Sequence, residues 1–202
     1  MDLIYCDEWL LVVNKPAGLL SVPGRGEDKQ DCLSSRLQHE FPDALVVHRL
    51  DMATSGLLIF ARGAAMQSRL SGMFRERLVS KRYVAVVAGV LEEDDGQIDL
   101  PIGADWPNRP RQKIDATQGK HSLTLYRVLT RNAETTRLEL EPVTGRTHQL
   151  RVHMTAIGHP ILGDALYGNQ ASAPRLLLHA QSLGFPHPVS NMPLRLECPA
   201  PF

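Results

Sequence analysis

Apolar residues occur along this chain of 202 residues in short continuous runs, in period-two alternation and in stripes with helical spacing. The first two patterns are typical of strands, whereas apolar positions three or four apart are typical of an amphipathic helix. The pattern predicts strands at Trp9–Val13, Leu57–Phe60, Tyr83–Val90, Ile98–Ile102, Leu123–Leu129, Arg137–Glu141, Leu176–Leu183 and Leu194–Cys198.

Three stripes predict helices. The first follows Asp31, which is placed to act as the N-cap, and ends before Pro42. The second covers Ala64–Arg77, and the third covers Thr147–Ile157 and is ended by Gly158. Strands outnumber helices and follow one another too closely for repeated βαβ units. The predicted fold class is therefore α+β, a mainly antiparallel mixed sheet with flanking helices, in a single domain over residues 1–202.

Composition narrows the class of protein. Hydrophobic residues make up 43% and charged residues 22%, which is ordinary globular usage rather than the composition of a disordered chain. No run approaches the roughly 18 apolar residues of a membrane helix, and acids stand where a signal peptide has bases, so we expect a cytoplasmic protein without a membrane partner. The three scattered cysteines favour neither a disulfide framework nor a zinc site.

Charge is balanced overall, with 22 basic and 22 acidic residues, but it is unevenly distributed. Bases outnumber acids between Arg49 and Arg82, and a second cluster lies in Trp106–Lys113, where an aromatic ring and stiff prolines accompany three bases. Such a mixture of side chains suits stacking on nucleobases and neutralising RNA phosphates, although ordinary solvated surface explains it equally well. The basic residues concerned are Arg49, Arg62, Arg69, Arg75, Arg77, Lys81 and Arg82 in the first cluster and Arg109, Arg111 and Lys113 in the second.

Asp51 stands out in the run His48-Arg49-Leu50-Asp51-Met52-Ala53-Thr54-Ser55-Gly56. It lies in a predicted loop just before an apolar strand, the position at which functional side chains concentrate. The alternative is an Asx-turn, in which the carboxylate only binds the backbone amides of Ala53 or Thr54.

Arg151 occupies a second unusual segment, Thr144–His153, which is polar yet carries part of an apolar stripe. At about 100° per residue, Arg151 lies beside this stripe, so its guanidinium could reach a partly buried carboxylate. A backbone anion site at the Thr144-Gly145-Arg146 entry and a solvated arginine remain open alternatives.

The histidines invite a metal interpretation that their spacing opposes. His148 and His153 are five residues apart, about 140° around a helix, and no cysteine is close in sequence. The chain also has no Walker loop, no dinucleotide fingerprint and no Gly-x-Ser-x-Gly elbow. We therefore expect neither a metal nor a cofactor.

Six ordered segments resemble the RluA family of pseudouridine synthases, most closely its RluA branch, and the resemblance covers nearly the whole chain. These segments are Val13–Gly18, His48–Gly56, Lys81–Ala85, Thr144–His153, Gly158–Asp164 and Leu176–Ala180. The resemblance implies the pseudouridine synthase catalytic fold and isomerisation of specific uridines in structured RNA, large-subunit rRNA, tRNA anticodon stem-loops or both, by a monomer without a cofactor.

Carried over by position, the resemblance makes Asp51 the catalytic aspartate, Tyr83 the active-site tyrosine and Arg151 the arginine that pairs with the aspartate. Arg49 is the residue that fills the space of the extruded nucleotide. Many relatives carry an S4 RNA-binding domain before the catalytic one, and we expect none here. The RNA-binding set is predicted as Arg49, Arg75, Arg77, Lys81, Arg82, Trp106, Arg109, Arg111, Lys113, Arg146 and His148.

The implied reaction breaks the C1′–N1 bond, turns the uracil and joins C5 to C1′, with no redox change and no group donor. Asp51 could attack C1′, add to C6 or assist a glycal route, and each route needs an ionised carboxylate. A non-catalytic RNA-binding or ribosome-assembly protein is the main alternative, but a pure binder has no need for Asp51, Tyr83 and Arg151 together. A glycosidase would ordinarily need a second carboxylate in the motif.

Overall fold

The computed structural model describes residues 2–202, which form two compact units. The first unit contains the chain up to Lys81 together with His179–Pro201, and the second contains Arg82–Leu178 and Phe202. The predicted single domain stays a prediction. Within residues 2–202 the strands of the protein pair mainly antiparallel, and three α-helices accompany them. The α+β fold class is therefore confirmed.

The first unit is built around neighbouring strands in the order β1-β2-β4-β11, with β3 on β4 and β12 on β11. Its pairs are antiparallel except β4 with β11, where His179 faces Ser55 in a parallel register. The strands are β1 (Asp2–Cys6), β2 (Leu10–Lys15), β3 (Ala44–Val46), β4 (Ser55–Arg62), β11 (Leu178–Pro186) and β12 (Pro193–Glu197).

Helix α2 (Ala64–Arg75) closes the core of this unit. Its buried stripe packs with alternate residues of β2 and β4, which is the arrangement that a period of 3.6 against a period of 2 predicts. Fully burying each such side chain contributes about 1.5–3 kcal/mol. The cluster consists of Leu10, Val12, Leu57, Ile59, Ala61, Met66, Leu70, Met73, Val79, Leu183, Phe185 and Cys198.

Helix α1 (Leu33–Glu40) begins one residue later than the Asp31 cap predicts. Cys32 is the N-cap, because its bridge to Leu20 holds it in extended backbone and its Sγ accepts the Ser35 amide at 3.4 Å. Asp31 instead forms a bidentate ion pair with Arg36 at 2.6 and 2.7 Å. The proposed capping role of Asp31 is therefore wrong.

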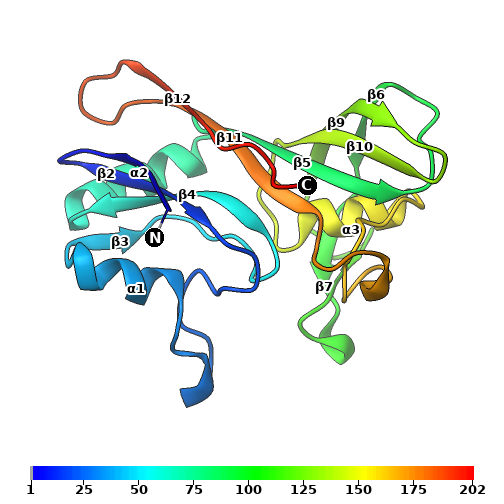
Figure 1. Ribbon diagram of the computed structural model, residues 1–202, viewed down its shortest axis with the longest axis horizontal. Coiled ribbons are helices and arrows are strands. Elements are labelled where there is room, and N and C mark those ends of the chain that lie inside the picture. The colour runs from blue at the N-terminus through cyan, green and yellow to red at the C-terminus, as the bar shows by residue number, and fades with distance from the viewer. Residues whose placement is uncertain (1) are drawn as a thin grey trace. The chain divides into compact units, whose positions relative to one another are not determined.

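The second unit contains an antiparallel array in the order β5-β10-β9-β6. Its strands are β5 (Ser80–Ala88), which enters this unit at Arg82, β10 (Thr135–Pro142), β9 (Leu123–Arg131) and β6 (Asp95–Asp99). Helix α3 (Gln149–Ala156) packs beside β9 and β10, and it begins two residues later than predicted (Figure 1).

A second, two-stranded sheet projects from this unit (Figure 1). The predicted strand Ile98–Ile102 is divided into β6 and β7 (Ile102–Ala104) around Pro101, which has no N–H for a ladder. Strand β7 pairs with β8 (Gln112–Ile114), and the short 3₁₀ helix Trp106–Asn108 lies between them. We call residues 102–114 the β7–β8 hairpin. The remaining 3₁₀ turns are Glu27–Lys29 and Gln170–Ser172.

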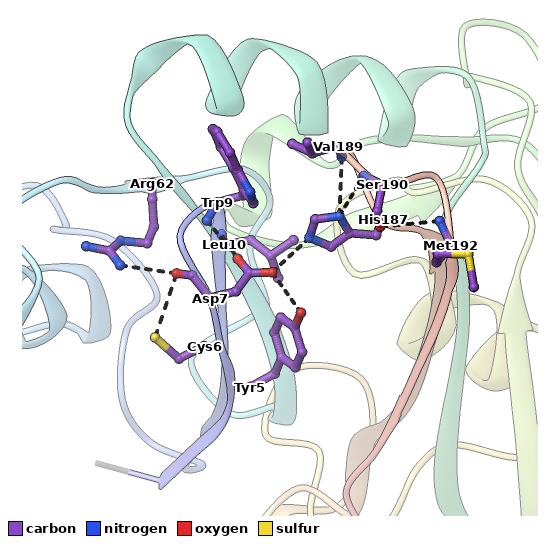
Figure 2. A network of polar contacts seen from close by, with 10 residues as sticks. All are labelled: Tyr5, Cys6, Asp7, Trp9, Leu10, Arg62, His187, Val189, Ser190 and Met192. Atoms are coloured by element: carbon purple, nitrogen blue, oxygen red, sulfur yellow. Dashed lines mark hydrogen bonds and ion pairs between the residues drawn. The ribbon is translucent and has the colours of Figure 1, made fainter.

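Asp7 joins two turns of the first unit, as Figure 2 shows. Its carboxylate accepts the Tyr5 hydroxyl at 2.7 Å, the Trp9 and Leu10 amides, and the His187 Nε2–H at 2.8 Å. Burial alone raises the pKa of Asp7, but these donors outweigh it and hold the pKa below its usual value. The network therefore ties the β1–β2 turn to the β11–β12 turn.

No helix within residues 2–202 is both long and apolar enough to cross a bilayer.

Candidate active site

Asp51 lies in the loop between β3 and β4, and its side chain is half-buried. The amide of Thr54 donates to the backbone carbonyl of Asp51 at 3.1 Å, which closes a turn through the main chain. The Asx-turn alternative, in which the carboxylate binds the backbone amides of Ala53 or Thr54, stays a prediction.

Leu50, the residue before Asp51, is held through both its backbone carbonyl and its backbone amide. The Ser21 hydroxyl donates to the Leu50 carbonyl at 2.7 Å and accepts the Leu50 amide at 3.1 Å, across 29 residues of sequence. Both residues are buried, so water does not compete for these bonds. Leu50 is thereby fixed against the loop that follows β2.

The residue after Asp51 is held by a buried lysine. The Lys15 ammonium, with a fully buried side chain, donates to the carbonyls of Pro16, Leu19 and Met52 at 2.7–3.1 Å. The Gly18 amide also donates to the Met52 carbonyl at 2.8 Å. Such charge-assisted bonds to carbonyl dipoles offset the desolvation of the ammonium. Asp51 is thus fixed by constraints on both of its neighbours.

Gly56 allows the end of this loop to approach β11 closely. Its φ is +113°, and a Cβ there would collide with the backbone of Ala180. The adjacent Ser55 hydroxyl lies 2.8 Å from His179 Nδ1, whose Nε2 lies 3.0 Å from the Cys198 carbonyl. A glycine is required here because its position combines left-handed backbone with contact to another main chain.

His48 anchors the start of the loop to β4. The Ile59 amide donates to His48 Nε2 at 3.0 Å, and the imidazole stacks on Phe74 with ring centroids 4.4 Å apart. Desolvation, with a smaller contribution from the charge of Lys81, lowers the pKa of His48 to about 3. His48 is therefore neutral with its proton on Nδ1, and it acts as an acceptor rather than a cation for RNA.

Arg151 is buried in the second unit, with a relative exposure of 4%. It forms a bidentate pair with Asp164, with Nε 2.8 Å from Oδ2 and Nη2 2.7 Å from Oδ1. Burial raises the pKa of Asp164, but the hydrogen bonds and charge of Arg151 outweigh it and lower that pKa overall. The prediction that Arg151 could reach a buried carboxylate is confirmed for Asp164, and the solvated-arginine alternative is wrong.

The first residues of α3 gather side chains around Tyr167. The Tyr167 hydroxyl lies 2.7 Å from His148 Nδ1 and accepts a hydrogen bond from the backbone N–H of Gln112 in β8 at 2.7 Å. The guanidinium carbons of Arg151 and Arg111 lie 5.1 and 5.5 Å from the Tyr167 ring centroid. The structure therefore brings together three of the predicted site residues, Arg111, His148 and Arg151.

His153, the more deeply buried of the two histidines weighed as metal ligands, has other partners. His153 is fully buried, with Nδ1 2.9 Å from the Thr124 hydroxyl and Nε2 2.9 Å from the Leu100 carbonyl. Desolvation lowers its pKa. Among residues 2–202, no group of three histidine, cysteine or acidic side chains is arranged to hold a metal ion.

Most predicted RNA-binding residues are exposed. Trp106 has a relative exposure of 64%, and the Arg109 guanidinium carbon lies 3.9 Å from its ring centroid. Arg82 is instead engaged in a cross-strand ion pair with Glu139 at 3.4 Å. The exposed members are Arg49, Arg75, Arg77, Trp106, Arg109, Arg111, Lys113 and Arg146, while Lys81, Arg82 and His148 are partly buried.

Comparison with known proteins decides what this arrangement is for. A family model described as RNA pseudouridylate synthase matches residues 9–156, about three quarters of the chain. The chain is 50% identical to the dual-specificity RNA pseudouridine synthase RluA of Yersinia pestis, with 100% of each chain covered. The chain belongs to the RNA pseudouridylate synthase family.

Further relatives extend this result. The chain is 49% identical to the RluA enzyme of Escherichia coli K12, over 99% of this chain and 93% of that one. The human RNA pseudouridylate synthase domain containing 1 has the same fold, with a TM-score of 0.83, 32% identity and coverage of 100% of this chain and 84% of that one. As a pseudouridylate synthase the protein is an isomerase that acts on RNA, and these findings favour catalysis over the non-catalytic alternative.

The three predicted catalytic residues of this pseudouridylate synthase come from different parts of the fold. Asp51 belongs to the first compact unit, and Tyr83 and Arg151 belong to the second. Tyr83 is partly buried on β5, opposite Leu140 of β10. Their catalytic roles, including the pairing of Arg151 with Asp51, stay predictions.

Sequence reasoning missed the residues that hold the catalytic candidates in place: Lys15, Ser21, Asp164 and Tyr167. Lys15 carried a signal, because a lysine directly after an apolar run has to find acceptors when it is buried. Ser21 carried none, since a serine in a predicted loop is unremarkable by sequence. Asp164 and Tyr167 lay in or beside a segment that resembled the family, but nothing in that segment identified Arg151 as their partner.

Proposed function

We propose that this pseudouridylate synthase has dual specificity and modifies uridines in both large-subunit rRNA and tRNA anticodon stem-loops. The observation that carries the proposal is the 50% identity to a dual-specificity enzyme over the full length of both chains. Recognition then depends on folded RNA shape rather than on long sequence motifs, because one site has to accept two RNAs. We also propose that the enzyme is a cytoplasmic monomer.

In this proposal Asp51 is the catalytic carboxylate. The constraints imposed on Leu50 by Ser21 and on Met52 by Lys15 support it, because a reacting group has to be held within a fraction of an ångström of its target. The carboxylate acts on the extruded nucleotide by attack at C1′, by addition to C6 or by assisting a glycal route.

Arg151 orients and neutralises the Asp51 carboxylate in the same proposal. Asp164 engages the Nε–Nη2 edge of the guanidinium, so the N–H groups that remain for a second carboxylate are those of Nη1 and the other N–H of Nη2. Lysine has one nitrogen and no planar fork, so it cannot serve both carboxylates in this geometry. Arg151→Lys is therefore expected to lose most of the activity although it keeps the charge.

Tyr83 and Arg49 are assigned to the flipped base. Extruding a stacked uridine costs a few kcal/mol, and an arginine inserted into the vacated space offsets part of that cost. Arg49 is exposed and lies two residues before Asp51, which suits the role of inserted residue. Tyr83 supplies a ring that can stack on uracil and a hydroxyl that can take part in the final proton transfer from C5.

The test uses transcripts of tRNA and of large-subunit rRNA fragments carrying uridine tritiated at C5, because joining C5 to C1′ releases that tritium. We expect release from one position in the anticodon stem-loop and from one or more positions in the rRNA, with chemical mapping to locate each site. Release from only one of the two RNA classes would restrict the enzyme to single specificity. Light scattering of the enzyme in solution tests the monomer.

A further inference from the structure

Tyr167 and Asp164 connect Arg151 to the β7–β8 hairpin, which carries the predicted RNA-binding residues Trp106, Arg109, Arg111 and Lys113, and all of these residues belong to the second unit. We propose that they are positioning residues: Asp164 sets the plane of the Arg151 guanidinium, and Tyr167 couples that guanidinium to the β7–β8 hairpin. RNA held by the hairpin then orients Arg151. The inference rests on the proposed pairing of Arg151 with Asp51.

Asp164 determines the orientation of Arg151 through two parallel bonds. A bidentate carboxylate–guanidinium pair fixes the guanidinium plane, which a single bond does not. Both side chains are almost fully buried, with exposures of 4% for Arg151 and 1% for Asp164, so the pair is neither screened nor exchanged with water. A rotation of the Asp164 carboxylate would therefore rotate the guanidinium plane, and with it the N–H groups of Arg151 that Asp164 does not bind.

Asp164 is itself held by the turn that it begins. Its Oδ1 accepts the amides of Leu166 and Tyr167 at 2.9 and 3.1 Å. Gly163, with φ of +73°, packs so closely on Arg175 that a Cβ would collide with the Arg175 carbonyl. The turn is therefore tightly constrained on both sides of Asp164, and Tyr167 is part of it.

The Tyr167 side chain extends from this turn to two other elements, the β7–β8 hairpin and α3. The Tyr167 ring lies within cation–π distance of both Arg151 and Arg111. Its hydroxyl joins the Gln112 amide of β8 and the His148 imidazole at the start of α3. One side chain thus contacts the hairpin, the helix that carries Arg151, and Arg151 itself.

The β7–β8 hairpin, which Tyr167 contacts, carries an exposed aromatic ring and basic side chains that suit RNA. Exposed Trp106 and Arg109 stack on one another, and Gln112, whose amide binds Tyr167, stands between Arg111 and Lys113. RNA whose nucleobase stacks on Trp106 and whose phosphates pair with Arg109, Arg111 and Lys113 would fix β8. Through the Gln112 backbone N–H it would also fix the Tyr167 ring. This gives a physical route by which binding of the correct RNA improves the geometry of catalysis.

The test separates binding from chemistry in Tyr167→Phe, which keeps the ring over Arg151 and removes the hydroxyl. We measure the single-turnover rate at saturating enzyme on a tritiated stem-loop, and the Kd for the same RNA in an Asp51→Asn background. We expect a rate about tenfold lower, because the variant loses the bonds of the hydroxyl to the Gln112 backbone N–H and to the His148 imidazole, with a Kd within about twofold of the parent. Tyr126→Phe, at a partly buried tyrosine of β9 packed over Gly96, is the control and should change neither value.

A double-mutant cycle tests the coupling itself. Trp106→Ala should slow single turnover in the wild-type background, and this effect on rate should largely disappear when Tyr167→Phe is already present, while the effects on Kd remain additive. Asp164→Asn, which keeps an acceptor for the turn but presents an amide to Arg151, should slow turnover about a hundredfold or more. If that variant does not fold, as judged by circular dichroism, Tyr167→Phe and the cycle decide the question.

Normal turnover by Tyr167→Phe, or additive effects of Trp106→Ala and Tyr167→Phe on rate, would overturn the inference. A normal rate for Arg151→Lys would instead overturn the proposed pairing with Asp51. The two failures are thus distinguishable, because the first leaves Arg151→Lys inactive.

Discussion

Replacing Ser21 with alanine removes the hydroxyl that bonds to both the amide and the carbonyl of Leu50, next to Asp51. Both Leu50 groups would lose a partner in a buried setting, which costs about 1–3 kcal/mol for each group left unsatisfied. Partial relaxation of the loop reduces the total, so we expect the free energy of unfolding to fall by about 2–4 kcal/mol. For a chain of this size the melting temperature should fall by roughly 4–16 °C.

The same change should impair catalysis separately from stability. A displacement of a reacting group by about 1 Å can lower a rate about a hundredfold, so we expect Ser21→Ala to slow single turnover by about 10- to 100-fold. Tritium release is measured well below the melting temperature of the variant, at saturating enzyme, so that unfolding does not contribute. Binding of the stem-loop should be nearly unchanged, because Ser21 is buried.

Ser68→Ala is the matched control, since Ser68 is an exposed serine of α2. It should keep the wild-type melting temperature within about 2 °C and the wild-type rate. Ser21→Ala with a melting temperature and a rate equal to those of Ser68→Ala would refute the reasoning that Ser21 fixes the loop of Asp51.

Three further predictions concern Arg49, the expected independence from metal ions, and Asp7. Arg49→Ala should lower the single-turnover rate more than the affinity for a stem-loop, and equal losses with a shallower salt dependence would instead mark an ordinary phosphate contact. Activity on refolded RNA should survive exhaustive EDTA treatment at constant ionic strength, and a loss restored specifically by zinc would contradict us. Because the pKa of Asp7 is depressed in the folded state, its contribution to stability is present above about pH 4 and is lost as the pH falls through the folded pKa. Urea unfolding should therefore show a difference between wild type and Asp7→Asn at pH 7 that shrinks at pH 3, and a constant difference would contradict the network.

Hydrophobic patterning located the main helices and most strands, because a buried face has to repeat with the period of its element. The strands that it missed, β1, β3 and β8, are short or half-exposed, so they carry little apolar signal. The N-cap of α1 was misplaced by one residue because Cys32, a weak capping residue by type, is held in extended backbone by a tertiary bridge to Leu20. Bonds of this long-range kind are not visible in local sequence.

The candidate site shows the same division. Asp51 and Arg151 were identified as candidates because their segments are polar next to apolar runs and resemble a family. The bidentate partner of Arg151 was not predicted to be Asp164, because 13 residues of helix end and turn separate the two. Ser21 and Lys15 act on Asp51 from 30 or more positions away, through backbone groups of its neighbours, and backbone acceptors leave no trace in the identity of the residues that carry them.

Tritium release by Asp51→Asn and Asp51→Ala on a stem-loop tritiated at C5 tests the central claim most directly. The account predicts that both variants fold, bind the RNA with a Kd within about threefold of wild type, and release no tritium above background, because the carboxylate is the group that reacts or stabilises charge. Measurable single turnover by either purified variant would contradict this account and move the chemistry to another residue.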